Sequence, residues 1–337
     1  MPAAEGPILV IGGVVPFDAV PAPLLLAAFV LGVLTMLALL AARRSLTTRA
    51  RRADPAETAH PAPAPACLGP AIGAAVRAGE LQLHYQPKLD CRTSKVCGAE
   101  ALSRWTLPDG TRLQPEEFVT KAETVGGIAD LTLWGVERTL EDSGKLADGA
   151  LGGPIFVNLS GKLITPEFAV RLIDLVGDQT RRIGFEITET AVLENPEKAL
   201  ECLFALRDAG LALAIDDYGA GLSSLSYLKQ IPASELKIDR KFIQGMIRSN
   251  RDPLIVRSTI DLCHGLGMTV TAEGVEDAMT ASLLGVMGCD TIQGYFVSAA
   301  VPIDELLRFV EEHRGKELRV PQIRKKAGFA KPAQGHP

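Results

Sequence analysis

Eight short apolar runs, most of them followed by a segment with helical periodicity, constrain the fold of this chain more than any other feature. Most gaps between the runs carry apolar residues at helical spacing, in segments 115–140, 166–176, 196–209, 241–266 and 277–287. Strand and helix alternating eight times is typical of an α/β, TIM-like (β/α)8 barrel. The apolar runs cover residues 81–87, 96–104, 155–159, 183–189, 211–217, 235–239, 269–273 and 291–296.

The gap between the first two runs differs from the others. Only residues 88–95 separate run 81–87 from run 96–104, which is too short for a crossover helix. The two runs should therefore pair as an antiparallel hairpin. We expect a closed barrel with one antiparallel strand, folded from residues 67–314.

The charge of the chain is unevenly distributed. The net charge of the 337 residues is −5, but residues 67–314 hold 24 basic and 35 acidic residues, a net charge of −11. Proteins that bind DNA or RNA polymers rely on many Lys and Arg contacts to phosphates, so we expect no such partner. Because 47% of residues are apolar and only 22% are charged, a disordered chain is also excluded.

An uncharged stretch near the N-terminus predicts a membrane anchor. Residues 24–42 are almost wholly apolar, and nineteen helical residues span about 28 Å, close to the ~30 Å hydrocarbon core. A cleaved signal peptide is the main alternative, but it would need a basic leading segment that this chain lacks. Five arginines at 43–52 follow the stretch and place its C-terminal side in the cytoplasm. The expected organisation is a short non-cytoplasmic N-terminus (1–22), a transmembrane helix (23–42), a basic and then Pro/Ala-rich linker (43–66), the barrel (67–314) and a basic disordered tail (315–337).

Polar side chains recur where the apolar runs end. In a barrel of this type the C-terminal strand ends form one rim, where catalytic groups gather. Several carboxylates at one rim would repel each other unless cations neutralised them, and oxygen ligands without His or Cys favour Mg²⁺ or Mn²⁺. Two such ions would suit displacement at a phosphate. These polar residues are Glu100, Asn158, Glu186, Glu189, Asp216, Asp217, Lys237, Asp239, Glu273, Glu276 and Gln293.

Each rim residue also has a structural alternative. Glu186 and Glu189 would serve equally as caps of the helix that follows, and Asn158 as a turn residue. Lys237 would form an ion pair with Asp239. Their joint occurrence at successive strand ends favours a functional site.

The rim residues belong to a series of eight short motifs. In chain order the motifs are Tyr85-Gln86-Pro87, Glu100-Ala101-Leu102-Ser103-Arg104, Val157-Asn158-Leu159-Ser160, Glu186-Ile187-Thr188-Glu189, Asp216-Asp217-Tyr218-Gly219-Ala220-Gly221, Leu236-Lys237-Ile238-Asp239-Arg240, Ala272-Glu273-Gly274-Val275-Glu276 and Gln293-Gly294-Tyr295. With these motifs in this order, the chain resembles the EAL family of cyclic-di-GMP phosphodiesterases from about residue 68 to 314. The glycine-rich motif reads DDYGAG, where DDFGTG is usual in that family, and the basic residue that often follows the position of Ser298 is missing.

The resemblance implies a role for each matching residue. The first metal would be bound by Glu100, Asn158, Glu186 and Asp216, and Asp217 would help to bind the second. Lys237 would hold the attacking water or the phosphate, Glu273 would activate that water, and Glu276 and Gln293 would support the shell of metal and water. The substrate contacts implied are Gln86, Leu102, Arg104, Asp239 and Gln293, and Glu189 would support the loop after Asp217 and the dimer interface.

The resemblance also implies a function. We expect two Mg²⁺ or Mn²⁺ ions to assist hydrolysis of cyclic-di-GMP to linear pGpG by a homodimer anchored in the bacterial inner membrane. A non-hydrolytic cyclic-di-GMP receptor and a phosphodiesterase for another diester are the alternatives. Because no metal ligand of the family is lost from this sequence, the enzyme is favoured.

Overall fold

The computed structural model describes residues 8–10, 13–15, 68–146, 151–219 and 228–313. The chain divides into two compact units, Met1–His60 and Pro61–Pro337. In the first unit, β1 (Ile8–Val10) and β2 (Gly13–Val15) pair antiparallel, a hairpin that the sequence did not predict. The expected transmembrane helix at 23–42, the linker at 43–66 and the tail at 315–337 lie outside the described residues. None of the helices that the structure describes is long and apolar enough to cross a membrane.

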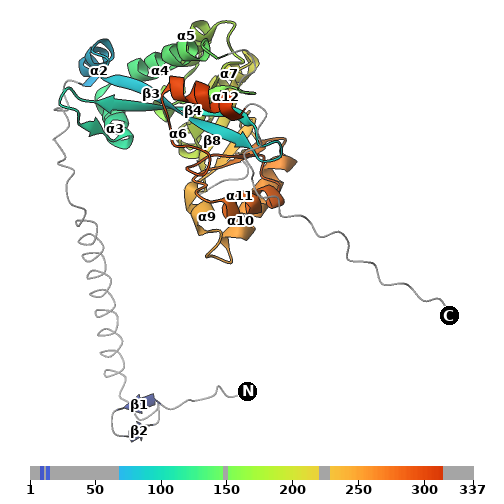
Figure 1. Ribbon diagram of the computed structural model, residues 1–337. Helices are drawn as coiled ribbons and strands as arrows, with labels where there is room; N and C mark the ends of the chain where they lie inside the picture. The colour runs from blue at the N-terminus through green and yellow to red at the C-terminus, as the bar shows by residue number, and fades with distance from the viewer. Residues whose placement is uncertain (1–7, 11–12, 16–67, 147–150, 220–227, 314–337) are drawn as a thin grey trace. The chain divides into compact units, whose positions relative to one another are not determined.

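Eight strands of the second unit close into a ring (Figure 1). Neighbouring strands follow the order β4-β6-β7-β8-β9-β10-β11-β3, and β3 pairs with β4 to complete the circle, while the short β5 (Arg112–Leu113) extends β4 outside it. All eight predicted runs form strands of this ring, so the predicted barrel is confirmed. The ring strands are β3 (Leu81–Asp90), β4 (Val96–Thr106), β6 (Ile155–Asn158), β7 (Ile183–Thr188), β8 (Ala212–Tyr218), β9 (Glu235–Ile238), β10 (Thr269–Ala272) and β11 (Thr291–Ile292).

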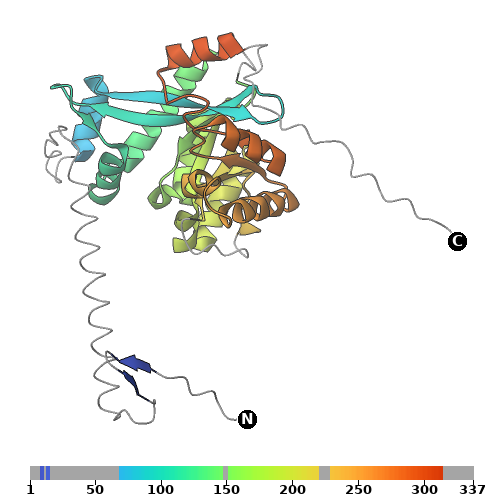
Figure 2. The ribbon, with the colours of Figure 1, turned by 60° about the horizontal axis from the view of Figure 1, so that its bottom comes forward.

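The first strand of the ring is the reversed one. β3 runs antiparallel to both of its neighbours, β4 and β11, whereas the other neighbouring strands of the ring are parallel. The predicted hairpin is therefore confirmed, although both of its strands are longer than predicted. Figure 2 shows this long hairpin with α2 (Leu68–Arg77) and α3 (Pro115–Val125) near one end.

Two of the predicted helices are each split in two. Segment 115–140 forms α3 and α4 (Ile128–Ser143), because Gly126 and Gly127 between them adopt φ angles of 87° and 106°, which end a helix. Segment 241–266 forms α9 (Arg240–Gly245) and α10 (Asp252–Gly265). The second helix has a proline in its first turn, a favoured place for proline.

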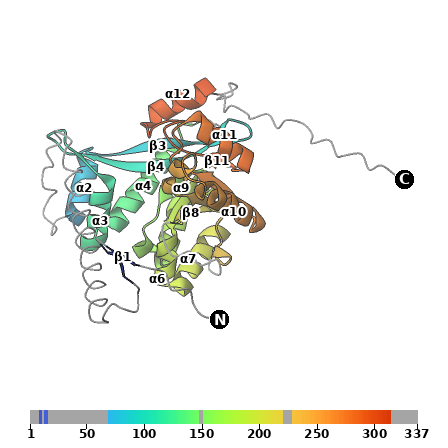
Figure 3. The same ribbon diagram turned by 90° about the horizontal axis from the view of Figure 1, so that it is seen from below.

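The remaining helices include three that were predicted. α5 (Pro166–Val176), α7 (Pro196–Asp208) and α11 (Ala278–Met287) match the expected segments. The sequence did not predict α2, α6 (Glu189–Glu194), α12 (Ile303–His313) or the 3-10 turn Gly161–Leu163. Figure 3 shows the helices gathered around the strands of the ring.

A second apolar core lies beside the barrel. Trp105 and Phe118 are buried there with their rings edge to face, 5.7 Å between centroids. Ile72 from α2 and Leu131 from α4 complete the cluster, so α2 has an apolar partner outside the ring. This small core supports the end of the β3–β4 hairpin, and the hairpin carries Gln86 and Glu100 opposite each other.

The last strand is shorter than predicted. Run 291–296 is a strand only over Thr291–Ile292, because Gly294 adopts φ of 150° and turns the chain. The Val275 backbone N–H then donates to the Gln293 carbonyl, at 3.1 Å. This turn places Gln293 at the mouth of the ring with the other rim residues.

Candidate active site

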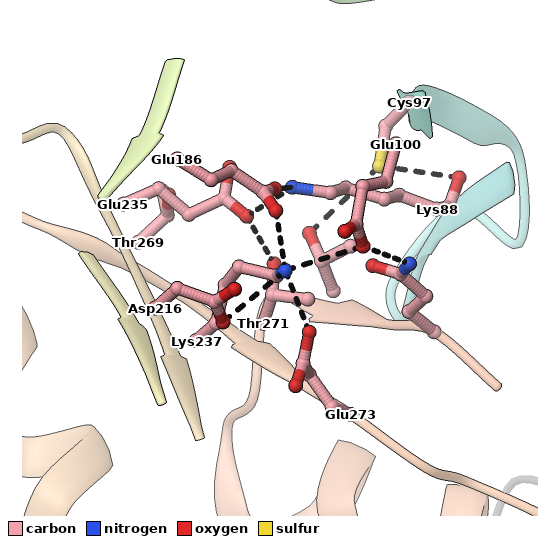
Figure 4. A network of polar contacts seen from close by, with 12 residues as sticks. Lys88, Cys97, Glu100, Glu186, Asp216, Glu235, Lys237, Thr269, Thr271 and Glu273 are labelled. Atoms are coloured by element: carbon pink, nitrogen blue, oxygen red, sulfur yellow. Dashed lines mark hydrogen bonds and ion pairs between the residues drawn. The ribbon is translucent and has the colours of Figure 1, made fainter. Parts of the chain in front are cut away.

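Lys237 lies at the centre of the rim residues and is fully buried. It belongs to β9, between Leu236 and Ile238, whose side chains are buried on the other face of the strand. Its Nζ atom contacts a carboxylate from each of β4, β7, β8 and the residue after β10, as Figure 4 shows. The distances are 2.5 Å to Glu186, 2.6 Å to Glu273, 3.2 Å to Glu100 and 3.3 Å to Asp216.

Glu100 is fixed by two amide side chains. Its Oε1 atom accepts a hydrogen bond from Asn158 Nδ2 at 2.9 Å, and its Oε2 atom accepts one from Gln293 Nε2 at 2.7 Å. Gln293 Nε2 also donates to Gln86 Oε1, at 3.1 Å. Gln293 Oε1 is buried and has no hydrogen-bond partner among the described residues. A buried acceptor without a partner is costly, and this oxygen is available to a bound cation or water molecule.

Burial and the neighbouring charges shift the pKa values of the rim carboxylates in both directions. Burial first, and then the neighbouring Glu100 charge, raise the pKa of Glu186 to about 8, against the opposing charges of Lys237 and Lys88. Burial likewise raises the pKa of Glu273 to about 7. Glu100 is also buried, but the Lys237 charge and the Asn158 hydrogen bond hold its pKa at about 2. Burial opposes the charge of Lys237, yet the surrounding carboxylates keep its pKa well above the usual value.

Asp217 extends this cluster toward the solvent. Oxygen atoms of Asp216, Asp217 and Glu273 lie within 4.8 Å of one another. The Asp217 backbone adopts φ of 54° and donates its N–H to Asp216 Oδ1 at 2.9 Å. Burial and the Asp216 charge raise the pKa of Asp217. A set of oxygen donors with surplus negative charge fits Mg²⁺ or Mn²⁺ and does not fit a metal that prefers sulfur or imidazole.

A cavity of about 310 Å³ opens beside the cluster. Gln86, Leu102 and Arg104 line it together with Gln293, so the structure brings these four predicted substrate contacts together. A cavity of about 450 Å³ borders the cluster as well and is lined by several of the predicted metal ligands. The first cavity is also lined by residues to which the sequence analysis gave no role, namely Arg240, Gln244, Gly274, Gly294, Tyr295 and Ala300.

Three of the predicted site residues lie outside the group of carboxylates that contact Lys237. Asp239 accepts the Lys241 backbone N–H at 2.7 Å and so caps α9. Glu276 is exposed, lines the first cavity and accepts a hydrogen bond from Gln244 at 2.9 Å. Glu189 is buried at the start of α6, but the loop that it is expected to support falls in residues 220–227, outside the described part of the chain.

The structure answers whether Lys237 forms an ion pair with Asp239, one of the structural alternatives raised by the sequence. Lys237 pairs with four carboxylates of the rim, and the lysine that approaches Asp239, at 3.7 Å, is Lys241. Lys88 is a further buried lysine that contacts this cluster, and the sequence analysis did not select it. Two-residue alternation along β3 puts Lys88 on the same face as Gln86, but Lys88 lies within β3 and not at a strand end, the feature by which the rim residues were selected.

Comparisons with known proteins agree with this fold. MucR of Pseudomonas aeruginosa, described as a bifunctional diguanylate cyclase/cyclic di-GMP phosphodiesterase, is 34% identical over 239 residues, which cover 68% of this chain and 34% of MucR. NbdA of the same species, described as a cyclic di-GMP phosphodiesterase, is 34% identical over 248 residues, covering 71% and 31%. This chain therefore spans about a third of the length of these curated relatives.

A solved structure and a family match complete the comparison. The structure, described as the PaMucR phosphodiesterase in complex with c-di-GMP, has a TM-score of 0.67 and is 31% identical, covering 71% of this chain and 99% of that one. The EAL domain family matches residues 71–300, which include the whole ring of strands. The chain therefore belongs to the EAL domain family.

Proposed function

We propose that this chain hydrolyses cyclic di-GMP to linear pGpG. The observation that carries the proposal is the position of Lys237, whose ammonium group is shared by four carboxylates at the mouth of the barrel. Support comes from MucR and NbdA, whose names describe this activity, and from the related structure in complex with c-di-GMP. The cavity beside the carboxylates supplies Arg104, whose guanidinium group suits bidentate recognition of a phosphate.

The chain would hold two divalent cations at this rim. Glu100, Asn158, Glu186 and Asp216 would bind the first ion, and Asp217 with Asp216 would bind the second. When bound, such ions lower the pKa of a water molecule and balance the charge of the phosphate oxygens. The ions would also offset the negative charge that the rim carries, so that an acidic site accepts an anionic substrate.

Two residues of the chain would handle the attacking water. Lys237 Nζ contacts Glu273 Oε1 at 2.6 Å, so both groups reach the same region of the rim. Glu273 would accept the proton of the water, and burial, which raises its pKa, makes it a stronger base than an exposed carboxylate. Lys237 would hold the water or the phosphate oxygen in place by its fixed positive charge.

A hydrolysis assay with the full chain tests this function. Incubation with cyclic di-GMP and Mg²⁺ or Mn²⁺ should yield pGpG, measured by chromatography, and Glu100→Gln or Asp217→Asn should remove the activity. Glu311→Gln, at an exposed position of α12, is the control and should leave it unchanged. Tight binding of cyclic di-GMP without pGpG would instead identify a receptor. Faster turnover of a competing diester would identify another substrate.

The membrane location is a separate part of the proposal. The apolar stretch 23–42 and the arginines after it would anchor the chain in the bacterial inner membrane with the EAL domain in the cytoplasm. Fractionation of cells that express the full chain should find it in the membrane fraction. A chain without residues 1–66 should move to the supernatant, and its retention in the membrane would contradict the anchor.

We also propose that the barrel forms a homodimer. On α10, Leu254 is 68% exposed and Ile255 is 44% exposed, and both border a hollow that Tyr218 also lines. A second copy of the chain would cover this apolar surface. Sedimentation of the full chain in detergent should give the mass of a dimer, and Leu254→Asp should shift it to a monomer.

A further inference from the structure

Lys88 is a buried lysine inside the barrel for which the proposed reaction gives no role. Its side chain is 2% exposed, and its Nζ atom contacts Glu186 Oε1 at 2.8 Å and Glu235 Oε1 at 2.7 Å. The same Nζ atom lies 3.9 Å from the centroid of the Phe156 ring. Lys88 therefore has two anionic partners and one aromatic partner, which fix the position of its charge.

The reversed strand, β3, places the charge of Lys88 inside the barrel. Gln86 and Lys88 are two residues apart on β3 and lie on the same face of the strand. Gln86 lies opposite Glu100, and Lys88 lies opposite Gly98, one step further from the rim. Lys88 therefore contacts Glu186 from further inside the barrel than the rim, and Figure 4 shows Lys88 and Lys237 on different sides of the Glu186 carboxylate.

The surroundings of Lys88 are shaped to keep it in place. Phe156 on β6 lies opposite Gly184 on β7, and a side chain at position 184 would overlap the Phe156 ring. On the other side, Thr271 Oγ1 donates to Glu235 Oε1 at 2.7 Å. The carboxylate that anchors Lys88 is therefore itself oriented by a hydrogen bond.

The two oxygen atoms of Glu186 face different partners. Oε1 accepts from Lys88 and Oε2 accepts from Lys237. Oε2 points to the same ammonium group as Glu100, Asp216 and Glu273. With Oε1 held by Lys88, only Oε2 is directed to the rim where cations would bind.

We propose that Lys88 is a positioning residue, which holds Glu186 Oε1 so that Glu186 offers a divalent cation a single oxygen, Oε2. The inference rests on the proposed function for its consequence in catalysis, but the binding of a cation tests it independently. Without Lys88 the Glu186 carboxylate would be free to rotate or to bind through both oxygens. The cation site would then lose its fixed geometry. Partners that orient a metal ligand typically contribute 10–100-fold to metal affinity or activity.

The test measures Mn²⁺ binding to the full chain by calorimetry. Lys88→Met should weaken Mn²⁺ binding at least 10-fold and lower kcat by a similar factor, while KM for cyclic di-GMP stays within about 2-fold, as expected for loss of a group that orients a metal ligand. The matched control is Lys145→Met. Lys145 also pairs with a carboxylate, Asp142 at 2.7 Å, but lies on the surface, so this variant should bind Mn²⁺ as the parent does.

A double variant separates positioning from simple neutralisation. Lys88→Met combined with Glu235→Gln leaves no unpaired Glu235 charge, so it should fold even where the single variant does not. The inference requires that Mn²⁺ binding stays weak in the double variant. Binding restored to the parent level, or unchanged binding in Lys88→Met, would show that Lys88 only neutralises Glu235. If the parent chain binds Mn²⁺ but makes no pGpG, the proposed function is wrong. The role of Lys88 is still tested in that case, by comparing Mn²⁺ binding of the parent with that of Lys88→Met.

Discussion

Lys237 carries a positive charge that four carboxylates share, so at the scale of the residue its loss should be severe. Lys237→Met should abolish hydrolysis and lower the free energy of unfolding of the cation-free chain by about 3–5 kcal/mol, the usual cost of removing one partner of a buried ion pair. Urea unfolding measures this. Lys198→Met, at an exposed position of α7, should change the unfolding free energy by less than about 0.5 kcal/mol. An equally small change for Lys237→Met would mean that the charge of Lys237 is not needed to hold the carboxylates together.

The rim residues were predictable because of where they stand in the strands. Apolar strands of a barrel end in polar residues at the functional face, so Glu186, Asp216 and Glu273 could be selected from the sequence. Lys88 could not be selected in that way, since it lies below the rim on the one reversed strand. A polar residue facing the inside of a closed barrel looks, in sequence, like one facing solvent on an open sheet.

At the scale of the element, Gly294 ends β11 in a conformation that other residues rarely adopt. A Cβ atom at position 294 would overlap the backbone N and O atoms of Val275. Gly294→Ala should therefore cost about 3 kcal/mol or more in unfolding free energy. It should also displace Gln293 from Glu100 and lower kcat.

The control for Gly294→Ala is a second glycine with a positive φ, at a position where an added Cβ atom would meet no neighbour. Gly288 ends α11 in the left-handed region, and nothing lies within 4 Å of its Cβ position. Gly288→Ala should cost only about 1–2 kcal/mol and leave kcat unchanged. Equal losses in the two variants, measured by urea unfolding, would show that the overlap with Val275 does not matter.

Asp277 caps the N-terminus of α11, and its contribution to stability should depend on pH. Its carboxylate accepts the backbone N–H groups of Thr280 and Met279, and these hydrogen bonds hold its pKa below the usual 3.8. Asp277→Ala should lower the unfolding free energy by about 1 kcal/mol at pH 7. Because the folded pKa is lowered, the contribution is complete above pH 3.8 and is lost as the pH falls through the folded pKa.

Asp277→Asn is the matched control for the cap. Its side-chain oxygen accepts the same hydrogen bonds but does not titrate in this range. The difference between parent and Asp277→Ala, measured by urea unfolding at several pH values, should shrink on acidification. The difference between Asp277→Asn and Asp277→Ala should not. A constant difference in both comparisons would show that the charge of Asp277 contributes nothing to the cap.

Three helices were missed by the sequence analysis, each for a different reason. α2 packs on α3 and α4 in the second core, so its stability comes from partners distant in sequence rather than from its own periodicity. α6 is only six residues long and gives too short a pattern to read. α12 does carry apolar residues at helical spacing, Ile303, Leu306 and Val310, all buried, so its signal could have been found.

At the scale of the whole molecule, the closed ring brings residues that are far apart in sequence together in one site. Glu100 and Gln293 are 193 positions apart, yet their side chains are hydrogen-bonded at 2.7 Å because β3 joins β4 to β11. The closure was predictable from eight alternating runs and one short gap. The pairing of particular side chains was not, because it depends on register and on turns such as the one at Gly294.

The same closure predicts that cations stabilise the entire barrel. A cation bound between β4, β7 and β8 would link strands across the ring. It would also favour the charged forms of Glu186 and Glu273, whose pKa values are raised first by burial and then by neighbouring carboxylates. At 100 times its dissociation constant, Mn²⁺ should add about 2.7 kcal/mol, which corresponds to a rise in Tm of about 5–10 °C for a domain of this size. Calorimetry with and without EDTA measures the rise, with Na⁺ at matched ionic strength as the control for screening. Asp216→Asn should remove most of the effect. A Tm that Na⁺ raises as much as Mn²⁺ does would contradict a cation site and indicate general screening of the acidic rim.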